Sequence, residues 1–138
     1  MTIQTQDKTK NMPDNEFASE KNLIERDETR ALISSDKVEG TRVYNGEGEK
    51  LGSIHHMMIG KYDGQVRYAV MSFGGLFGMG EDFYPLPWNR LTYDTDREGY
   101  VVAVTKDQLN SDAMPGFARH DAPEWNADFD ERIRVYWL

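Results

Sequence analysis

Glycine, proline and asparagine residues divide the chain between residues 38 and 104 into short stretches rich in β-forming residues. Asn45-Gly46 favours positive φ angles at consecutive positions and predicts a tight hairpin turn. Asp63-Gly64 predicts a second hairpin. Runs this short and this regularly interrupted predict an all-β fold, in which an antiparallel sheet curls into a small barrel. The stretches expected to form strands are 41–44, 51–59, 66–73, 83–88, 93–94 and 100–104.

The composition limits the kind of partner. A length of 138 residues favours one domain with tails. The formal net charge is −8, and no cluster of Lys or Arg interrupts this acidity. A protein that follows nucleic-acid phosphates needs a basic face, so direct nucleic-acid binding is not expected. The absence of cysteine excludes disulfides, thiolate metal sites and a cysteine nucleophile.

Residues 1–31 are mostly polar and charged, and such a segment buries too little apolar surface to offset its ordering entropy. We expect a disordered leader, which could still order on a partner. No apolar stretch has the form of a signal peptide or approaches the roughly 20 residues that span a bilayer. We therefore expect a cytoplasmic protein without membrane insertion: a leader (1–31), a barrel (32–110) and an extension (111–138) that packs on the barrel or on a partner.

Two of the expected strands carry information about their neighbours. Pro85 and Pro87 cannot donate ladder hydrogen bonds, so stretch 83–88 is an edge strand or is leaving the sheet. Stretch 66–73 is apolar on both faces, which predicts a central strand, or one that joins the barrel interior to an outer contact. That outer contact is either the C-terminal segment or a second subunit. One face carries Val66, Tyr68 and Val70, and the other carries Ala69, Met71 and Phe73.

Two short helices are expected after the strands. Thr105 and Gln108 have the spacing of a capping box, which predicts a helix that ends near Asn110. Near the C-terminus, apolar side chains recur at helical spacing and predict a short amphipathic helix. A strand over residues 133–137 is the weaker alternative. The apolar residues of the predicted C-terminal helix are Phe129, Ile133, Tyr136 and Trp137.

Four segments together resemble the PRC-barrel family: VEGTRVYN at 38–45, GEKLGSI at 48–54, GQVRYAVMSFGG at 64–75 and GMGEDFYPLPW at 78–88. The resemblance covers roughly residues 32–110, and residues 115–137 look like the extension of stand-alone bacterial members. It implies a six-stranded antiparallel barrel that serves as an adaptor or assembly surface. The family has no established catalytic residues that could be transferred to this chain.

The same family includes the cytoplasmic domain of the photosynthetic reaction-centre H subunit and the C-terminal domain of a ribosome maturation factor. The H subunit has an N-terminal membrane helix, whereas residues 1–31 of this chain are polar. The maturation factor has a preceding second barrel, for which this chain has no room. The resemblance therefore carries over neither membrane anchoring nor ribosome binding.

The Gly-rich stretch 74–80 is the first candidate interaction site. Such loops can bind phosphate through backbone amides, but a P-loop needs Gly-Lys-Ser/Thr where this chain has Gly-Glu-Asp. A flexible loop is the favoured interpretation, with apolar side chains that cover a barrel end or contact a partner. Those side chains are Leu76, Phe77 and Met79.

Trp88 and Trp137 complete the predicted interaction residues. Together with Trp125 and the tyrosines they could form an aromatic platform for a ligand. Aromatic residues more often fill cores or interfaces, because each buries a large area. We favour packing.

Stretch 94–99 imitates the start of a calcium loop, but its twelfth position is Thr105 rather than glutamate, so a hairpin turn is favoured over weak divalent-ion binding. His55 and His56 are adjacent in an expected strand and should point to opposite faces, where they cannot easily share one metal. His120 lies in a polar stretch. No catalytic residue, metal ligand or cofactor is assigned.

These observations predict a non-catalytic adaptor or assembly module that contacts another protein or itself. A homodimer is the expected oligomer, on the basis of the two-sided strand and the Gly-rich loop. By analogy with the H subunit, the alternative is a membrane-associated regulator of electron transfer. By analogy with the maturation factor, a third interpretation is an accessory protein of ribosome or RNA maturation.

Overall fold

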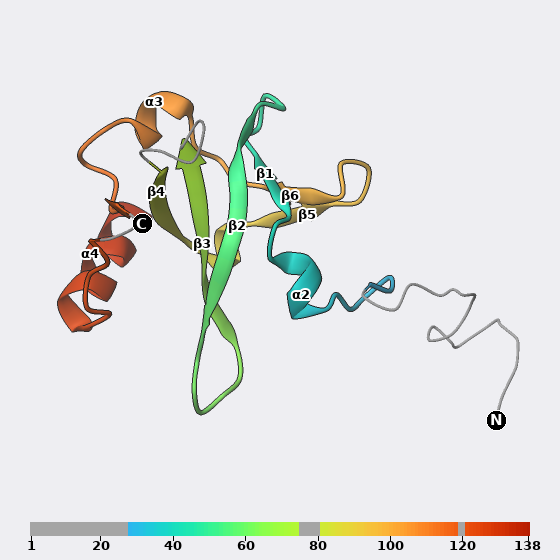
Figure 1. Cartoon of the computed structure of the whole chain (residues 1–138), viewed down its shortest axis with the longest axis horizontal. Coiled ribbons are helices and arrows are strands. Elements are labelled where there is room, and N and C mark those ends of the chain that lie inside the picture. Colours follow the sequence, from blue (N-terminus) through green and yellow to red (C-terminus); the bar gives the residue numbers. More distant parts are fainter. Residues whose placement is uncertain (1–27, 75–80, 119–120) are drawn as a thin grey trace, which may run out of the picture. The chain divides into compact units, whose positions relative to one another are not determined.

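The computed structural model describes residues 28–74, 81–118 and 121–138 (Figure 1). The chain divides between Val38 and Glu39 into two compact units. The described part of the first unit includes a short helix, α2 (Ser35–Val38). Within this unit, Lys37 Nζ lies 2.7 Å from Glu28 Oε1.

The second unit is built on a sheet in which the described strands follow the order β5-β6-β1-β2-β3-β4-β7. Its helices are η3 (Trp88–Arg90), α3 (Lys106–Leu109) and α4 (Ala127–Tyr136). Its strands are β1 (Arg42–Tyr44), β2 (Lys50–Ile59), β3 (Val66–Gly74), β4 (Glu81–Pro87), β5 (Thr92–Asp94), β6 (Gly99–Val101) and β7 (Phe117–Ala118).

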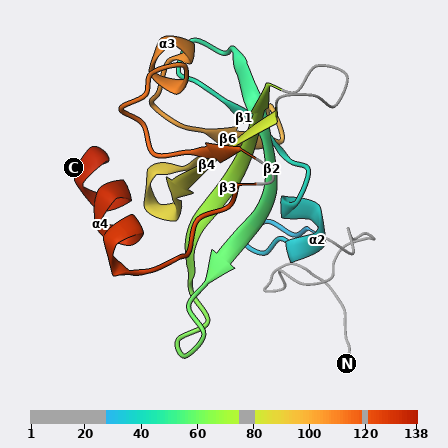
Figure 2. The same ribbon diagram turned by 60° about the vertical axis from the view of Figure 1, so that its left-hand side comes forward.

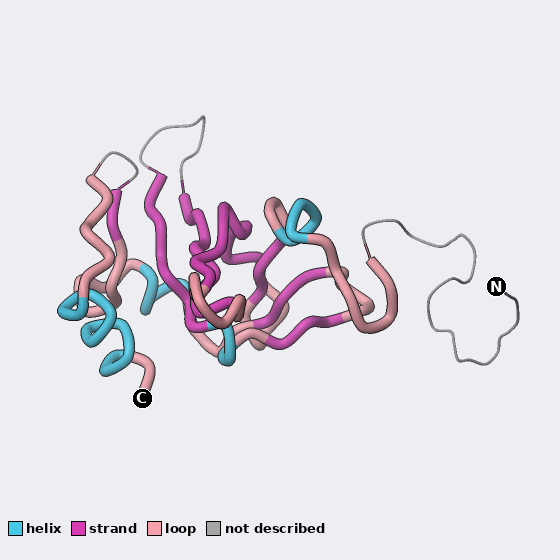
Figure 3. The backbone as a smooth tube through the Cα atoms, turned by 90° about the horizontal axis from the view of Figure 1, so that it is seen from below, coloured by secondary structure: helices cyan, strands magenta, loops and turns pink. Residues whose placement is uncertain are grey.

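The β-rich prediction is confirmed, but the closed, six-stranded antiparallel barrel is wrong. The described residues form seven strands, and β1 pairs with β6 in parallel, with Val43 opposite Tyr100. The end strands β5 and β7 do not pair, so the sheet is curved but not closed (Figure 3). The connection through η3 brings the β5–β6 hairpin to the free edge of β1. The seventh strand comes from the C-terminal extension.

The turn between β1 and β2 differs from the tight turn expected at Asn45-Gly46. Positive φ occurs at Gly48 (88°), not at Asn45-Gly46. The Gly48 amide donates to the Asn45 carbonyl (3.1 Å), and the Asn45 side-chain oxygen accepts from the amides of Glu47 (3.0 Å) and Glu49 (2.9 Å). The loop lies where the expected strands left it, at residues 45–49, but its conformation is different because the buried Asn45 side chain bonds across it and the left-handed residue is Gly48.

Three local predictions are confirmed. β2 and β3 are antiparallel around Asp63-Gly64, with φ of 73° at Gly64. The capping box of α3 is formed: Thr105 Oγ1 accepts from the Gln108 amide (3.1 Å), and Gln108 Oε1 accepts from the Thr105 amide (2.8 Å). The C-terminal helix is α4, so the strand alternative for residues 133–137 is wrong.

The prolines predicted an edge strand or a strand that leaves the sheet; β4 is instead the penultimate strand, and its prolines lie beyond the part that pairs with β7. In the described part of the chain, only Asp82 and Phe83 of β4 pair with β7. Pro85 and Pro87 lie opposite residues of β3 and have no strand on their other side. The missing N–H groups therefore cost no ladder hydrogen bond.

The core lies on the inner face of the sheet, where neighbouring strands bring buried side chains together, as in the pair Ile54–Met71. Tyr84 Oη donates to the Leu109 carbonyl (2.5 Å), which ties β4 to α3. Burial raises the pKa of Tyr84, so its hydroxyl remains a donor. The most deeply buried apolar side chains here include Val43, Ile54, Met71, Leu86 and Leu109.

Candidate interaction surface

The outer face of β3 and β4 is covered by the C-terminal segment, which lies beside these strands in Figures 1 and 2. The Tyr68 ring lies 5.6 Å from the Trp125 ring, centroid to centroid, and its hydroxyl donates to Asp130 of α4. Trp125 packs on Phe129 (5.1 Å). Of the two outer contacts that the sequence left open for the two-sided strand, the C-terminal segment is the one that the structure shows. The second apolar face of β3 therefore no longer requires a second subunit.

The pKa of Tyr68 makes the attachment of α4 dependent on pH. Burial and the hydrogen bond to Asp130 raise this pKa from 10.0 to about 12. Because the folded pKa is above the ordinary value, the contribution is complete below pH about 10 and is lost as the pH rises through about 12. We expect the tryptophan fluorescence of the wild type to change over this range, because Trp125 packs on the Tyr68 ring.

In Tyr68→Phe we expect the alkaline change in fluorescence to disappear. We also expect a loss of only about 1 kcal/mol in the free energy of unfolding at pH 7, because the site is partly exposed. Tyr62→Phe is the matched control, since Tyr62 is 98% exposed. An identical alkaline step in wild type and Tyr68→Phe would show that the hydroxyl does not hold α4.

Trp88 and Trp137 make contacts within the chain. The half-buried Trp88 packs on Tyr100, with ring centroids 5.3 Å apart. Trp137 is only 8% exposed; Arg90 donates to its carbonyl, and the Arg90 guanidinium lies 6.0 Å from its ring centroid. η3 thus joins both tryptophans to the rest of the unit. The other predicted interaction residues, Leu76, Phe77 and Met79, lie outside the described residues.

The far end of the β2–β3 hairpin presents exposed apolar side chains. Tyr62 is 98% exposed and Ile59 is 53% exposed. The hairpin extends beyond its neighbours because β1 pairs only with the start of β2, and β4 pairs with β3 no further than Tyr68. In both Figure 1 and Figure 2 it ends in a loop clear of the other strands of its unit. We call Ile59 and Tyr62 the hairpin tip.

The backbone that carries the tip is held by hydrogen bonds. The Gly60 amide donates to the Gln65 carbonyl (2.7 Å). Asp63 Oδ1 accepts from the Gln65 amide (3.0 Å), and Arg67 donates to Asp63 Oδ2 (2.7 Å). The Gln65 amide, and then Arg67, hold the pKa of the Asp63 carboxyl below its usual value. Tyr62 therefore projects from an ordered turn. The residues predicted as interaction sites do not include Tyr62, although an aromatic residue beside an Asp-Gly turn was a usable signal.

A model of the PRC-barrel domain matches residues 32–109. The chain belongs to the PRC-barrel domain family. Membership suggests a small domain that functions in protein–protein interaction in general. No curated protein sequence matches the chain.

The hairpin tip and η3 lie within the PRC-barrel match at residues 32–109, whereas β7 and α4 lie beyond it. The outer face of the PRC-barrel sheet is thus covered by a segment that the family model does not include. The exposed large apolar side chains described in the second unit fall into two groups. The hairpin tip belongs to the family domain, whereas Val135 and Leu138 belong to the extension.

The two adjacent histidines of the PRC-barrel domain do not point to opposite faces. β2 holds one extra residue, His55, between the pairs Ile54–Met71 and His56–Val70. Such a bulge breaks the alternation of side chains, and the two Nδ1 atoms lie 2.8 Å apart. Burial, and then the charge of His55, lower the pKa of His56.

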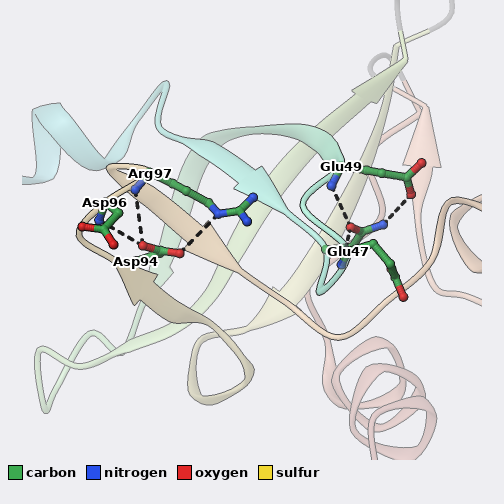
Figure 4. Close-up of polar contacts among 6 residues, drawn as sticks. Glu47, Glu49, Asp94, Asp96 and Arg97 are labelled. Atoms are coloured by element: carbon green, nitrogen blue, oxygen red, sulfur yellow. Dashed lines mark hydrogen bonds and ion pairs between the residues drawn. The ribbon is translucent and has the colours of Figure 1, made fainter.

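The loop of residues 94–99 is a hairpin turn between β5 and β6, as favoured from the sequence. Asp94 Oδ1 accepts from the amides of Asp96 (3.0 Å) and Arg97 (3.3 Å), and Asp94 Oδ2 lies 3.3 Å from Arg97 Nε (Figure 4). The Arg97 guanidinium lies 5.3 Å from the Tyr44 ring centroid of β1. Both Asp94 oxygens are thus used within the chain.

Two kinds of feature are absent from the described residues of the PRC-barrel protein. No group of three or more His, Cys, Asp or Glu side chains there has the arrangement of a metal site. None of the helices in the same ranges is both long and apolar enough to cross a bilayer.

Proposed function

We propose that this PRC-barrel protein is a non-catalytic, cytoplasmic adaptor or assembly module that binds another protein through the hairpin tip. The observation that carries the proposal is the 98% exposure of Tyr62 on a turn held by hydrogen bonds. Tyrosine is enriched among residues that dominate binding energy. An ordered turn also reduces the entropy lost on binding.

The charges around the tip suggest how a partner is recognised. Lys61 is exposed beside Tyr62, and Arg67 is paired with Asp63. The local charge is therefore slightly positive on a chain whose net charge is −8. An apolar pocket with an acidic rim complements this surface. A second copy of the chain is the first partner to test, because its acidic surface offers carboxylates for such a rim, and a homodimer is the proposed oligomer.

The self-association test is light scattering of the full chain over a wide concentration range. We expect a dimer mass that falls to the monomer mass in the double variant Ile59→Ser/Tyr62→Ser. The matched control is Leu138→Ser, which also changes an exposed apolar residue (84% exposed) but in the extension. A monomer mass at every concentration would exclude the homodimer.

The test for a different partner is a quantitative pull-down from native lysate, separated into membrane and soluble fractions. We expect one protein to be retained by the wild type and by Leu138→Ser, and lost with Ile59→Ser/Tyr62→Ser. A membrane electron-transfer complex or a ribosomal protein retained in this pattern would support the corresponding family analogy. Equal retention by all three proteins would contradict the assignment of the tip.

A further inference from the structure

The bulge in β2 joins His55 and His56 by a hydrogen bond that only some protonation states allow. Their Nδ1 atoms lie 2.8 Å apart, and the rings cross at 80° with centroids 5.1 Å apart. One Nδ1 donates a proton, and the other accepts it through its lone pair. A first additional proton binds at the free Nε2 of the donor ring and leaves this bond intact. A second additional proton must occupy the accepting Nδ1, which removes the acceptor and places two positive rings in contact.

The surroundings of the pair oppose that second proton. Burial, and then the charge of His55, lower the pKa of His56, while Glu39 acts in the opposite direction. Arg42, the residue of β1 nearest to the pair in register, is a further positive charge on that side. The residues of β3 that pair with this stretch of β2 are uncharged, and Asp82 of β4 belongs to the other face of the sheet. The two rings therefore hold a second additional proton only at acidic pH.

A continuous series of ring contacts joins the pair to the C-terminal extension. The His55 ring packs edge-on against Phe83 of β4, with centroids 5.0 Å apart and planes at 68°. Phe83 packs on Phe117, its pairing partner in β7, with centroids 5.7 Å apart. Phe117 in turn lies 6.4 Å from Phe129 of α4, centroid to centroid. Because β7 is only two residues long, these ring contacts are a substantial part of what holds the extension to the sheet.

We propose that the His55–His56 pair is a pH switch that controls how firmly the C-terminal extension covers the outer face of β3 and β4. When both rings are positive, their repulsion moves His55 away from Phe83, because His55 is exposed whereas His56 is half-buried. Loss of the contact with Phe83 loosens Phe117, and with it β7 and α4. The extension then uncovers part of the outer face of the PRC-barrel sheet.

The direction of the switch follows from the pKa of His56. This pKa is lower in the folded chain than its ordinary value of 6.5. The unfolded chain, or a state in which the pair is separated, therefore binds more protons than the closed state at acidic pH. The closed state has its full stability above pH 6.5 and loses stability as the pH falls below this value. Histidine is the side chain suited to this range.

The test is hydrogen–deuterium exchange of the full chain, read by mass spectrometry between about pH 7.5 and about pH 5 and corrected for the intrinsic exchange rate. Carboxylates ordinarily titrate near pH 4, below this range. We expect the protection of peptides from α4 to fall by at least about threefold across the range, while peptides from β2 and β3 keep theirs. Nitrogen-15 spectra of the histidine rings should show the second additional proton binding over the same range.

Two variants remove the switch in different ways. His55→Phe keeps a ring against Phe83 but binds no proton, and His56→Asn removes the second positive ring. In both, the protection of α4 should stay constant across the range. His120→Asn, which changes the remaining histidine of the chain, is the matched control and should keep the wild-type fall.

Circular dichroism verifies that the variants fold, and His55→Phe is expected to fold because His55 is exposed. The proposal is overturned if α4 loses as much protection in His55→Phe and His56→Asn as in the wild type, or if the wild type shows no loss. An equal loss in α4, β2 and β3 would also overturn it, because the pH would then act on the whole fold rather than on the extension.

Discussion

Replacing Gly52 with alanine is expected to lower the free energy of unfolding by about 3 kcal/mol or more. A Cβ atom at this position would lie 2.0 Å from the backbone oxygen of Ser72 and 3.1 Å from Met71 Cγ. The oxygen belongs to β3, which is paired with β2 immediately beside this point through Ser53 and Ser72. Neither strand can move away without losing that pairing, so the strain cannot be relieved by rotating a side chain.

Denaturant unfolding followed by circular dichroism measures this effect. The matched control is Gly46→Ala in the preceding turn, where an added Cβ would meet no atom within 4 Å and φ is not positive. We expect this control to stay within about 0.5 kcal/mol of the wild type. If Gly52→Ala were as stable as Gly46→Ala, the close approach of β2 and β3 at Gly52 would be wrong.

Ile133→Ala is expected to have the second large effect, a loss of about 2–5 kcal/mol. Ile133 is fully buried at 0% exposure, in the middle of the helix that covers the outer face of β3 and β4. Truncation leaves a cavity that the strands cannot fill, because they are already held by their own pairing. The contacts of Trp125 and Trp137 with the rest of the unit should weaken at the same time.

The control for this prediction lies on the same helix. Val135 is 52% exposed, and alanine has the higher helix propensity, so Val135→Ala should change stability by no more than about 0.5 kcal/mol. Unfolding is followed by tryptophan fluorescence and by far-ultraviolet circular dichroism. Similar losses in Ile133→Ala and Val135→Ala would contradict the orientation of α4 described above.

Features that depend on residues close together in the chain were predictable. The capping box needs only the side chains and amides of Thr105 and Gln108, which lie at the two ends of one four-residue turn. The helical spacing of Phe129 and Ile133 marks the buried side of α4 whatever it packs against. The Asp63-Gly64 turn likewise follows from backbone preferences at the turn itself.

Features that depend on pairing between distant segments were not predictable. The parallel pairing of β1 with β6 joins Val43 to Tyr100, and no local pattern indicates which free edge a later hairpin will reach. β7 is only two residues long, which is too short for a period of two to be recognised. The barrel was therefore predicted as closed and antiparallel, whereas the sheet is open and mixed.

The candidate sites, too, depended on pairing between distant segments. The predicted loop residues Leu76, Phe77 and Met79 remain a prediction, because they lie outside the described residues. Tyr62 was overlooked because its exposure depends on how far β1 and β4 extend along the hairpin. The histidine pair was assigned to opposite faces because alternation holds only in a strand without a bulge.

The sequence by itself determined the β-rich class, the PRC-barrel resemblance, the turn at Asp63-Gly64, the capped helix α3 and the amphipathic helix α4. All of these follow from backbone preferences and side-chain spacing over a few residues. Only the tertiary structure decided that the sheet stays open, that the extension covers the outer face of β3, and that His55 and His56 meet. These three outcomes depend on which distant segments pair and in which register, and that information is distributed over the whole chain.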